Sequence, residues 1–351
     1  MEFIGSLLLD SGLTPPDLNI IGKVVQWMYG WLGNYGLTVI VFALFLKILT
    51  FPLDFWQRLA SKKSSLKMIA LQPQLKDIDS QFEGDARRIN EEKQKLYKKN
   101  GYNAFSSCLP MLVTMAIFFV MFGGINSYSA FTAARDYNLL YDKYTSTYDL
   151  QIELGLTPEQ ALEDAKLAVG QYYVEEVRED FLWVNNIWRP DTWKSIMVEY
   201  DEFIKTNSSG VVNRNIYNNI REGVLESDVG YFGKVENGEV VREGWNGLLI
   251  MPILAAGIMF LSTWIMQKQQ NAKGGVDMTG QTQQSTKMMS FLMPLMMGVF
   301  GFMYTAAFAL YMVSNSSIST LVNLATNRPI ENLAIKQISK VENDKKPSYK
   351  R

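Results

Sequence analysis

A lysine inside an apolar stretch is the residue of this 351-residue chain best placed to do chemistry. Lys47 stands ten residues after Leu37 and nine before Trp56, so roughly 15 Å of helix separates it from either end. Placing a lysine at that depth in a bilayer costs on the order of 2.5 to 3.5 kcal/mol unless it faces water or a partner. Lys47 is therefore a candidate to bind a polar group or to relay a proton. A structural ion pair is the alternative, which a separation of about 10 Å from Asp54 along the helix disfavours.

Polar residues continue from Lys47 toward one end of its helix. Thr50 and Asp54 lie three and seven residues further on and share its face. The last apolar stretch has a matching stripe in steps of four residues, formed by Tyr311, Asn315, Ser319 and Asn323. The second stretch adds the polar groups of Ser106, Ser107 and Thr114. Each alone could be ordinary helix packing. Because a through-pore needs polar groups at all depths, their concentration in one half predicts a water-filled groove closed at the outer end.

The rest of the composition excludes most kinds of catalytic site. The chain has no histidine and a single cysteine, Cys108, so the sequence lacks the commonest metal ligand and general base and cannot form an internal disulfide. It also has no glycine-rich loop of the nucleotide-binding types. We therefore expect no enzyme, no cofactor, no metal site and no sequence-specific nucleic-acid partner.

Five apolar segments predict an all-α integral membrane protein with a five-transmembrane-helix core. A helix needs about 20 apolar residues to cross a bilayer. We place the spans at residues 37–56, 104–128, 246–266, 287–304 and 305–326. The last two follow each other without a charge, so we interpret them as a tight hairpin that turns at Phe302, Met303 and Tyr304. One long bent helix is the alternative.

The charges between the spans predict the orientation of the chain. Residues 57–103 carry 11 Lys and Arg against 6 Asp and Glu, and the tail from Arg328 carries 7 against 3, whereas residues 131–245 carry 11 against 21. Basic loops stay in the cytoplasm. We therefore expect the N-terminus and a large insertion at residues 129–245 outside, and the loop 267–286 and the tail 327–351 inside.

Residues 57–103 have the pattern of a cytoplasmic helical hairpin. Apolar residues recur at helical spacing, residues 83–85 break the pattern, Asp85 is a suitable N-cap and Asn100 a suitable stop. Pro73 is expected to kink the first arm. A solvated linker hairpin is the alternative.

The other two segments outside the spans also carry local signals. Within residues 1–36, the part from Ile20 to Leu32 is expected to be an interfacial helix, with a plain extension as the alternative. The insertion 129–245 is expected to be a module of mixed structure. Its Thr157 to Gln160 form a capping box that starts a helix running to about Glu179, and Asn237-Gly238 is typical of a two-residue β-hairpin.

Eight sequence blocks, taken in their order and spacing, carry a resemblance to a known family. They are Asn34 to Leu37, Lys47 to Leu53, Lys67 to Pro73, Leu96 to Pro110, Phe181 to Trp183, Pro190-Asp191, Met288 to Pro294 and Leu310 to Asn315. Together they resemble the YidC family of membrane insertases. That family usually has arginine where Lys47 stands, glutamine at Thr114 and often proline at Ala116, and its external loop is generally shorter. A positive charge survives the first change, but a bidentate guanidinium does not.

The resemblance implies an insertase with a cytoplasm-facing groove and a mobile hairpin at its mouth. Its expected partners are nascent membrane proteins, ribosomes, the Sec translocon and the lipid bilayer of the bacterial plasma membrane. The substrate groove would be lined by Lys47, Thr50, Thr114, Tyr311, Asn315, Ser319 and Asn323. A greasy slide for substrate helices would be formed by Leu112, Met115, Phe118 and Met312, which could otherwise be simple lipid-facing packing.

Two other functions stay open. A small-solute transporter would use Lys47 as a binding or relay group, and it should show a polar path to the outside and repeated halves, which we do not find in the sequence. A membrane-anchored sensor would depend on residues 131–245 and not on Lys47.

Overall fold

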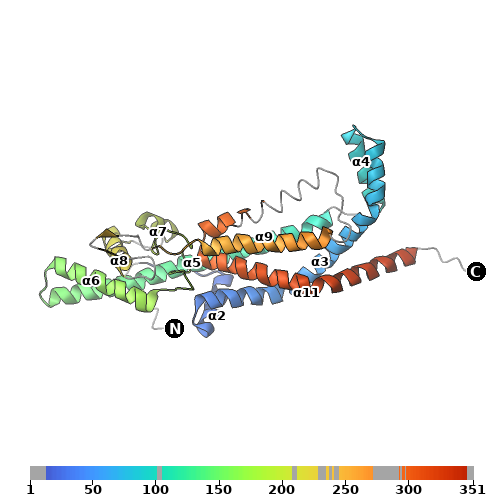
Figure 1. Ribbon diagram of the computed structural model, residues 1–351. Coiled ribbons are helices and arrows are strands. Elements are labelled where there is room, and N and C mark those ends of the chain that lie inside the picture. Colours follow the sequence, from blue (N-terminus) through green and yellow to red (C-terminus); the bar gives the residue numbers. More distant parts are fainter. Residues whose placement is uncertain are drawn as a thin grey trace, which may run out of the picture. The chain divides into compact units, whose positions relative to one another are not determined.

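A computed structural model shows a predominantly helical chain (Figure 1). It describes residues 13–100, 105–207, 212–227, 235–236, 239–240, 245–271, 292, 295–296 and 298–345, and of residues 105–114, 235–236, 239–240, 270–271 and 340–345 it describes the backbone alone. The longer helices are α2 (Ile20–Leu32), α3 (Tyr35–Gln81), α4 (Ala86–Lys99), α5 (Phe105–Glu153), α6 (Pro158–Tyr172), α8 (Arg214–Glu226), α9 (Ile250–Asn271) and α11 (Ala306–Lys345). Shorter elements are the π-helix η1 (Tyr173–Val177), α7 (Tyr200–Thr206) and the strands β1 (Val235–Glu236) and β2 (Glu239–Val240).

The chain forms two compact units, which we describe one at a time. The first unit comprises Met1–Ala43, Val120–Gly257 and Leu295–Ser314. The second unit comprises Leu44–Phe119, Ile258–Pro294 and Asn315–Arg351. Four long helices, α3, α5, α9 and α11, contribute residues to both.

Three helices in the described part of the chain are long and apolar enough to cross a membrane. They are Tyr35–Gln81, Met115–Glu153 and Ile250–Gln269, and they overlap the first three predicted spans. The predicted span at 287–304 lies partly outside the described residues, and the one at 305–326 is the first half of α11. These last two spans, and with them the five-span core, stay predictions.

The chain breaks its helix where a tight turn was predicted. A helical segment ends at Met303, and α11 begins at Ala306. Thr305 caps the new helix, since its Oγ1 accepts the backbone N–H of Phe308 at 3.3 Å. One continuous bent helix through this point, the alternative interpretation, is therefore wrong.

Helix α2 in the first unit is confirmed at the predicted residues. Asn19 Oδ1 accepts the N–H of Gly22 at 2.8 Å, and the helix ends at Gly33 in the left-handed conformation, with φ of 64°. Val25 and Met28 are buried, while Trp27 is 64% exposed. The helix thus packs one apolar side within the first unit, and its place at a membrane interface stays a prediction.

Residues 129–245, called the insertion module below, begin as a continuation of a membrane helix. Helix α5 runs without a break to Glu153, whereas the sequence analysis ended the second span at residue 128. The predicted capping box follows: Thr157 Oγ1 accepts the N–H of Gln160 at 3.3 Å, and the Gln160 amide oxygen accepts the N–H of Thr157 at 3.2 Å. The predicted β-hairpin is also confirmed, because Val235 pairs with Val240 and Glu236 with Glu239.

The module has an aromatic core and a close helix crossing. Tyr137 of α5 packs against Phe203 of α7 and Tyr217 of α8, with ring centroids 5.3 and 5.6 Å away. Helices α6 and α8 meet at Gly170 and Gly223. A Cβ placed on Gly170 would lie 2.4 Å from the Gly223 carbonyl oxygen, so only glycine allows this approach.

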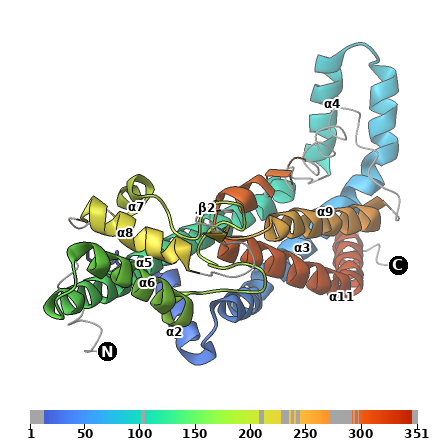
Figure 2. The ribbon, with the colours of Figure 1, turned by 60° about the vertical axis from the view of Figure 1, so that its left-hand side comes forward.

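The predicted helical hairpin is present in the second unit (Figure 2). Asp85 caps α4 by accepting the N–H of Arg88 at 3.0 Å, and Asn100 stands at its C-cap. A salt bridge of 2.5 Å from Lys93 Nζ to Asp79 Oδ1 joins the two arms. Pro52 and Pro73 both lie inside α3, which continues through them.

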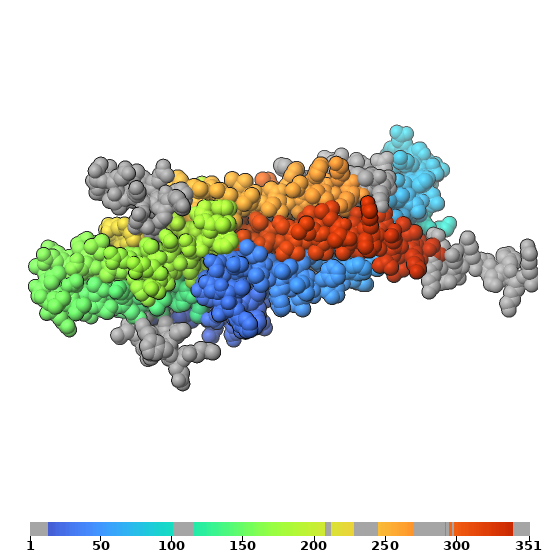
Figure 3. Space-filling model, turned by 60° about the horizontal axis from the view of Figure 1, so that its bottom comes forward, coloured from blue at the N-terminus to red at the C-terminus, as the bar shows by residue number. Residues whose placement is uncertain are grey.

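Helices α9 and α11 lie side by side in the second unit (Figure 3). The hydroxyls of Ser262 and Thr320 are 2.5 Å apart, and the Asn323 amide donates to the sulfur of Met266 at 3.2 Å. Helix α11 continues through Pro329 to Lys345, so the segment predicted as a basic tail is helical up to that residue.

Candidate functional site

Lys47 of α3 forms an ion pair with Asp54. Its Nζ lies 2.5 Å from Asp54 Oδ2, and the two side chains are 10% and 13% exposed. Seven residues are close to two full turns, so both side chains leave the helix on the same face. The lysine stem is long enough to cover the remaining distance. Our preference against an ion pair was therefore wrong, because axial rise alone underestimates the reach of a lysine.

The pair changes the electrostatics of the predicted groove. A lone ammonium would attract anions strongly at this depth, whereas a paired one presents a neutral, strongly dipolar unit. Thr50 lies between the partners and its hydroxyl is 3.5 Å from the Lys47 carbonyl oxygen, a contact at the limit of a hydrogen bond. Lys47, Thr50 and Asp54 thus form one polar patch on α3.

The predicted groove residues of α11 differ in exposure. Asn315, Ser319 and Asn323 are partly exposed within the second unit, while Tyr311 in the first unit is only 4% exposed. Thr114 lies in α5 at a position where the structure describes the backbone alone. The structure joins Asn323 to Met266 of α9, as described above.

The predicted slide residues are equally mixed. Met115 is 45% exposed and Phe118 is partly exposed, as expected for side chains that face lipid or a passing helix. Met312 is 7% exposed and is therefore packed inside the protein. The side chain of Leu112 lies outside the described residues.

Polar contacts that the sequence analysis missed connect α3 to α11 beyond Lys47. Arg58 donates to the Thr326 hydroxyl at 3.3 Å, and Lys62 Nζ lies 3.8 Å from Glu331 Oε1. Arg58 and Lys62 are four residues apart, so they project from one face of α3. That spacing was a visible signal, but only the folded chain shows which helix it faces.

A buried cluster in the first unit holds the start of α3 against α5 and the module. The hydroxyls of Tyr35 and Tyr128 are 2.8 Å apart, and Arg135 donates to the Tyr35 hydroxyl at 3.1 Å. Arg135 also pairs with Glu179, which accepts the indole N–H of Trp188. Tyr35 and Trp188 are in edge contact with ring centroids 5.2 Å apart. The Arg135 guanidinium and the Glu179 carboxylate thus hold together residues that are distant in the sequence.

Two carboxyl groups share the one guanidinium of this cluster. Arg135 contacts Asp136 Oδ1 at 2.6 Å as well as Glu179, so one cation faces two carboxylates. Burial raises the pKa of Glu179, and the nearby Asp136 raises it further, to about 8 against the opposing effect of Arg135. Glu179 therefore keeps its proton in the folded chain up to a pH of about 8.

Asp191 lies far from α9 in the sequence, and its carboxylate caps the beginning of that helix. It is fully buried, and its carboxylate accepts backbone N–H groups of Leu248 at 2.7 Å, Leu249 at 3.1 Å and Met251 at 2.6 Å. Trp183 donates its indole N–H to the same carboxylate at 3.0 Å. The first N–H groups of a helix lack internal partners and favour a negative charge. Phe181 to Trp183 and Pro190-Asp191, two of the sequence blocks that carry the family resemblance, thus position the start of α9.

Comparisons with known proteins place these features in context. A family model described as 60Kd inner membrane protein matches residues 27–333. A membrane protein insertase YidC of Chlorobium limicola is 35% identical over 138 residues, which is 39% of this chain and 22% of that protein. Another from Treponema denticola is 32% identical over 131 residues, 37% of this chain and 22% of that protein. The aligned segment therefore spans about a fifth of the length of these relatives.

Proposed function

The chain belongs to the YidC family of 60Kd inner membrane proteins, and from this we propose that it inserts nascent membrane proteins into the lipid bilayer. The family and the three apolar helices make it a membrane-integral protein. The family match over residues 27–333 is the observation that carries the proposal. We place the protein in a bacterial plasma membrane with its N-terminus outside and its C-terminus in the cytoplasm, on the charge distribution of its loops.

The polar patch on α3 is the proposed contact for the client. A hydrophilic segment of the client enters a groove from the cytoplasm, and Lys47 exchanges its bond to Asp54 for a bond to an acidic or polar group of the client. Supporting this, Lys47 and Asp54 are each more than 85% covered yet are joined by a single short contact. The exchange makes and breaks no covalent bond, so no enzyme chemistry is involved.

The remaining groove residues would solvate the client's polar segment along its path. Asn315, Ser319 and Asn323 offer amide and hydroxyl groups that are partly exposed, and the exposed Met115 offers an adaptable apolar surface to the client's helix. Ribosomes and the Sec translocon are proposed partners, with the basic hairpin of α3 and α4 as the cytoplasmic contact. The hairpin's excess of basic residues supports a polyanionic partner.

Site-specific crosslinking tests the proposal. A photoreactive residue at position 47 or 115 is expected to crosslink to a stalled nascent membrane protein, and the same residue at exposed Trp193 of the insertion module serves as the control. Crosslinks to the client from position 193 alone would contradict the groove.

The ion pair itself favours a second candidate, a small-solute transporter. A lysine and an aspartate paired within a predicted span are a common arrangement in proton and ion relays. Solute uptake by the purified protein in liposomes that is lost in Asp54→Asn, while client insertion by the same variant stays normal, would support the transporter and exclude the Lys47–Asp54 pair as the client contact.

A further inference from the structure

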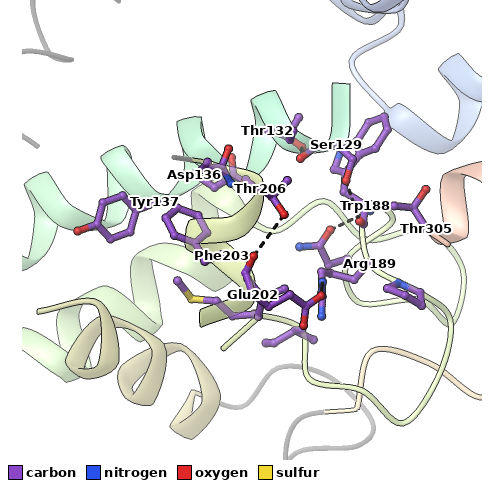
Figure 4. Close-up of a pocket in the computed structure, with 18 of the residues that line it drawn as sticks. Ser129, Thr132, Asp136, Tyr137, Trp188, Arg189, Glu202, Phe203, Thr206 and Thr305 are labelled. Carbon is purple, nitrogen blue, oxygen red and sulfur yellow. Dashed lines mark hydrogen bonds and ion pairs between the residues drawn. The ribbon is translucent and has the colours of Figure 1, made fainter. Parts of the chain in front are cut away.

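The first unit contains a partly open cavity that is separate from the proposed groove. It has a volume of about 450 Å³ and lies between α5, α7, α8 and the segments around residues 186–198 and 303–305 (Figure 4). Cavities of roughly 300 to 1,000 Å³ are typical of small-molecule sites. No predicted groove or slide residue whose side chain the structure describes lines it.

Aromatic rings form part of the cavity wall. Six contribute to it, namely Tyr137, Tyr173, Trp188, Phe203, Tyr217 and Tyr304. Tyr137, Phe203 and Tyr217 also pack on one another, with the Phe203 and Tyr217 centroids 4.8 Å apart, so the core of the module fixes their orientation. Rings held in this way favour a flat aromatic guest, which can meet them in stacked or edge contacts.

The covered charges at the cavity are already compensated. Arg189 Nη1 lies 3.6 Å from Glu202 Oε1, and Asp136 is held by Arg135 as described above. Figure 4 shows Ser129, Thr132 and Asp136 on α5, with Glu202 and Phe203 on α7 facing them. Lys194 also lines the cavity but is solvent-exposed. A charged ligand would meet no unpaired opposite charge in the covered part of the wall. The cavity therefore favours an uncharged ligand.

Three buried polar atoms of residues that line the cavity lack a hydrogen-bond partner in the described part of the chain: the hydroxyls of Tyr137 and Tyr173, and Oδ1 of Asn207. Of these residues, Asn207 is 3% exposed and Tyr137 is 1% exposed. Buried polar groups are nearly always paired, and an unpaired amide oxygen is an acceptor for a guest donor.

We propose that this cavity binds a small uncharged aromatic molecule that carries an N–H or O–H donor. Its ring packs among the aromatic side chains and its donor bonds to Asn207 Oδ1. The proposal is separate from the proposed insertion activity, because the cavity shares no residue with the described part of the groove.

Indole is a suitable probe because it is flat, uncharged and has one N–H donor. Its binding to the full-length protein in nanodiscs is measured by ligand-observed NMR, with empty nanodiscs correcting for partition into lipid. Saturable binding is expected, and 1-methylindole, which lacks the donor, should bind about five- to tenfold more weakly. The affinity of Asn207→Leu for indole should fall by the same factor, while its affinity for 1-methylindole should equal that of the wild type.

Two further variants complete the test. Ala133→Phe projects a ring into the cavity and should abolish binding of both probes. Asn218→Leu is the matched control, because this exposed asparagine on α8 does not line the cavity. Absence of saturable indole binding by the wild type would overturn the proposal, as would equal binding of both probes by the wild type and Asn207→Leu. If Ala133→Phe fails to fold, the comparison of indole with 1-methylindole on the wild type and on Asn207→Leu still tests the proposal.

Discussion

Lys47 and Asp54 stand seven residues apart on α3, and their charged groups are 2.5 Å apart. The pair connects the stability of the predicted first span with its proposed contact to clients. Removing one partner leaves a covered charge alone, which costs roughly 3 to 5 kcal/mol when burial is complete and less here, where about a tenth of each side chain is exposed.

A charge swap separates these two roles. Lys47→Glu and Asp54→Lys should each lower the midpoint of thermal unfolding in detergent, because like charges then face each other. The double variant should recover most of the stability, since the ion pair is restored with reversed order. If Lys47 contacts clients, the double variant still fails to complement an insertase-depleted strain, whereas Lys47→Arg complements it. Complementation by the double variant would show that only the pair matters.

Alanine at the helix crossing should destabilise the insertion module. Gly170→Ala or Gly223→Ala places a Cβ 2.4 Å from a backbone carbonyl oxygen of the other helix, so α6 and α8 must separate. A loss on the order of 1 to 3 kcal/mol is expected, measured as faster proteolysis of the module. Gly30→Ala is the control: its Cβ has nothing within 4 Å in α2, and it should be neutral or slightly stabilising. Equal effects at all three positions would contradict the close crossing.

Stability should fall as the pH rises through the range set by Glu179. Its pKa is raised to about 8 in the folded chain from an ordinary value of 4.5, so between these values the folded state holds a proton that the unfolded chain has lost. The unfolding free energy therefore decreases with rising pH across this window. Unfolding temperatures of Glu179→Gln should depend less on pH between about 5 and 8 than those of the wild type. The exposed Glu176→Gln should keep the wild-type dependence, and identical curves for all three proteins would exclude Glu179 as the titrating group.

The stability of the α3–α4 hairpin should depend more on the Lys93–Asp79 salt bridge than on the Arg87–Glu91 salt bridge. Lys93 and Asp79 connect the arms with side chains 10% and 34% exposed, whereas Arg87 and Glu91 form a pair along α4 that is 91% and 56% exposed. A double-mutant cycle with Asp79→Asn and Lys93→Gln should give a coupling energy of about 1 kcal/mol. The same cycle at Arg87 and Glu91 should give about 0.5 kcal/mol or less. Hydrogen exchange in α4 measures both, and equal couplings would contradict a special role for Lys93.

Local signals explain what the sequence predicted well. The N-caps Asp85 and Thr157, the stop at Asn100 and the break before Ala306 each depend on a few neighbouring residues, so they could be located without a fold. The continuation of α5 to Glu153 was missed because its charged and tyrosine-rich part has no local stop signal before Gly155, and the change in composition was taken for a boundary.

From the sequence, site residues could be grouped only when they lie on the same helix. Lys47 and Asp54 were identified, but the ion pair depends on side-chain reach that residue spacing does not give. Asp191 was known only as part of a matched block, since its three backbone partners lie almost sixty residues away. Contacts of that kind arise from tertiary packing and leave no periodic pattern in the sequence.

Within the first unit, α5 runs without a break from Tyr128 to Glu153, so the first part of the insertion module is one straight helical lever. From Tyr128 to Glu153 the helix rises about 37 Å, so a tilt of about 10° at its base displaces the far end by roughly 6 Å. Because α5 has no break between these two described residues, a tilt at Tyr128 is carried along the helix to Glu153. A spectroscopic label near Glu153 would therefore report a small tilt of α5 at Tyr128 as a displacement large enough to measure.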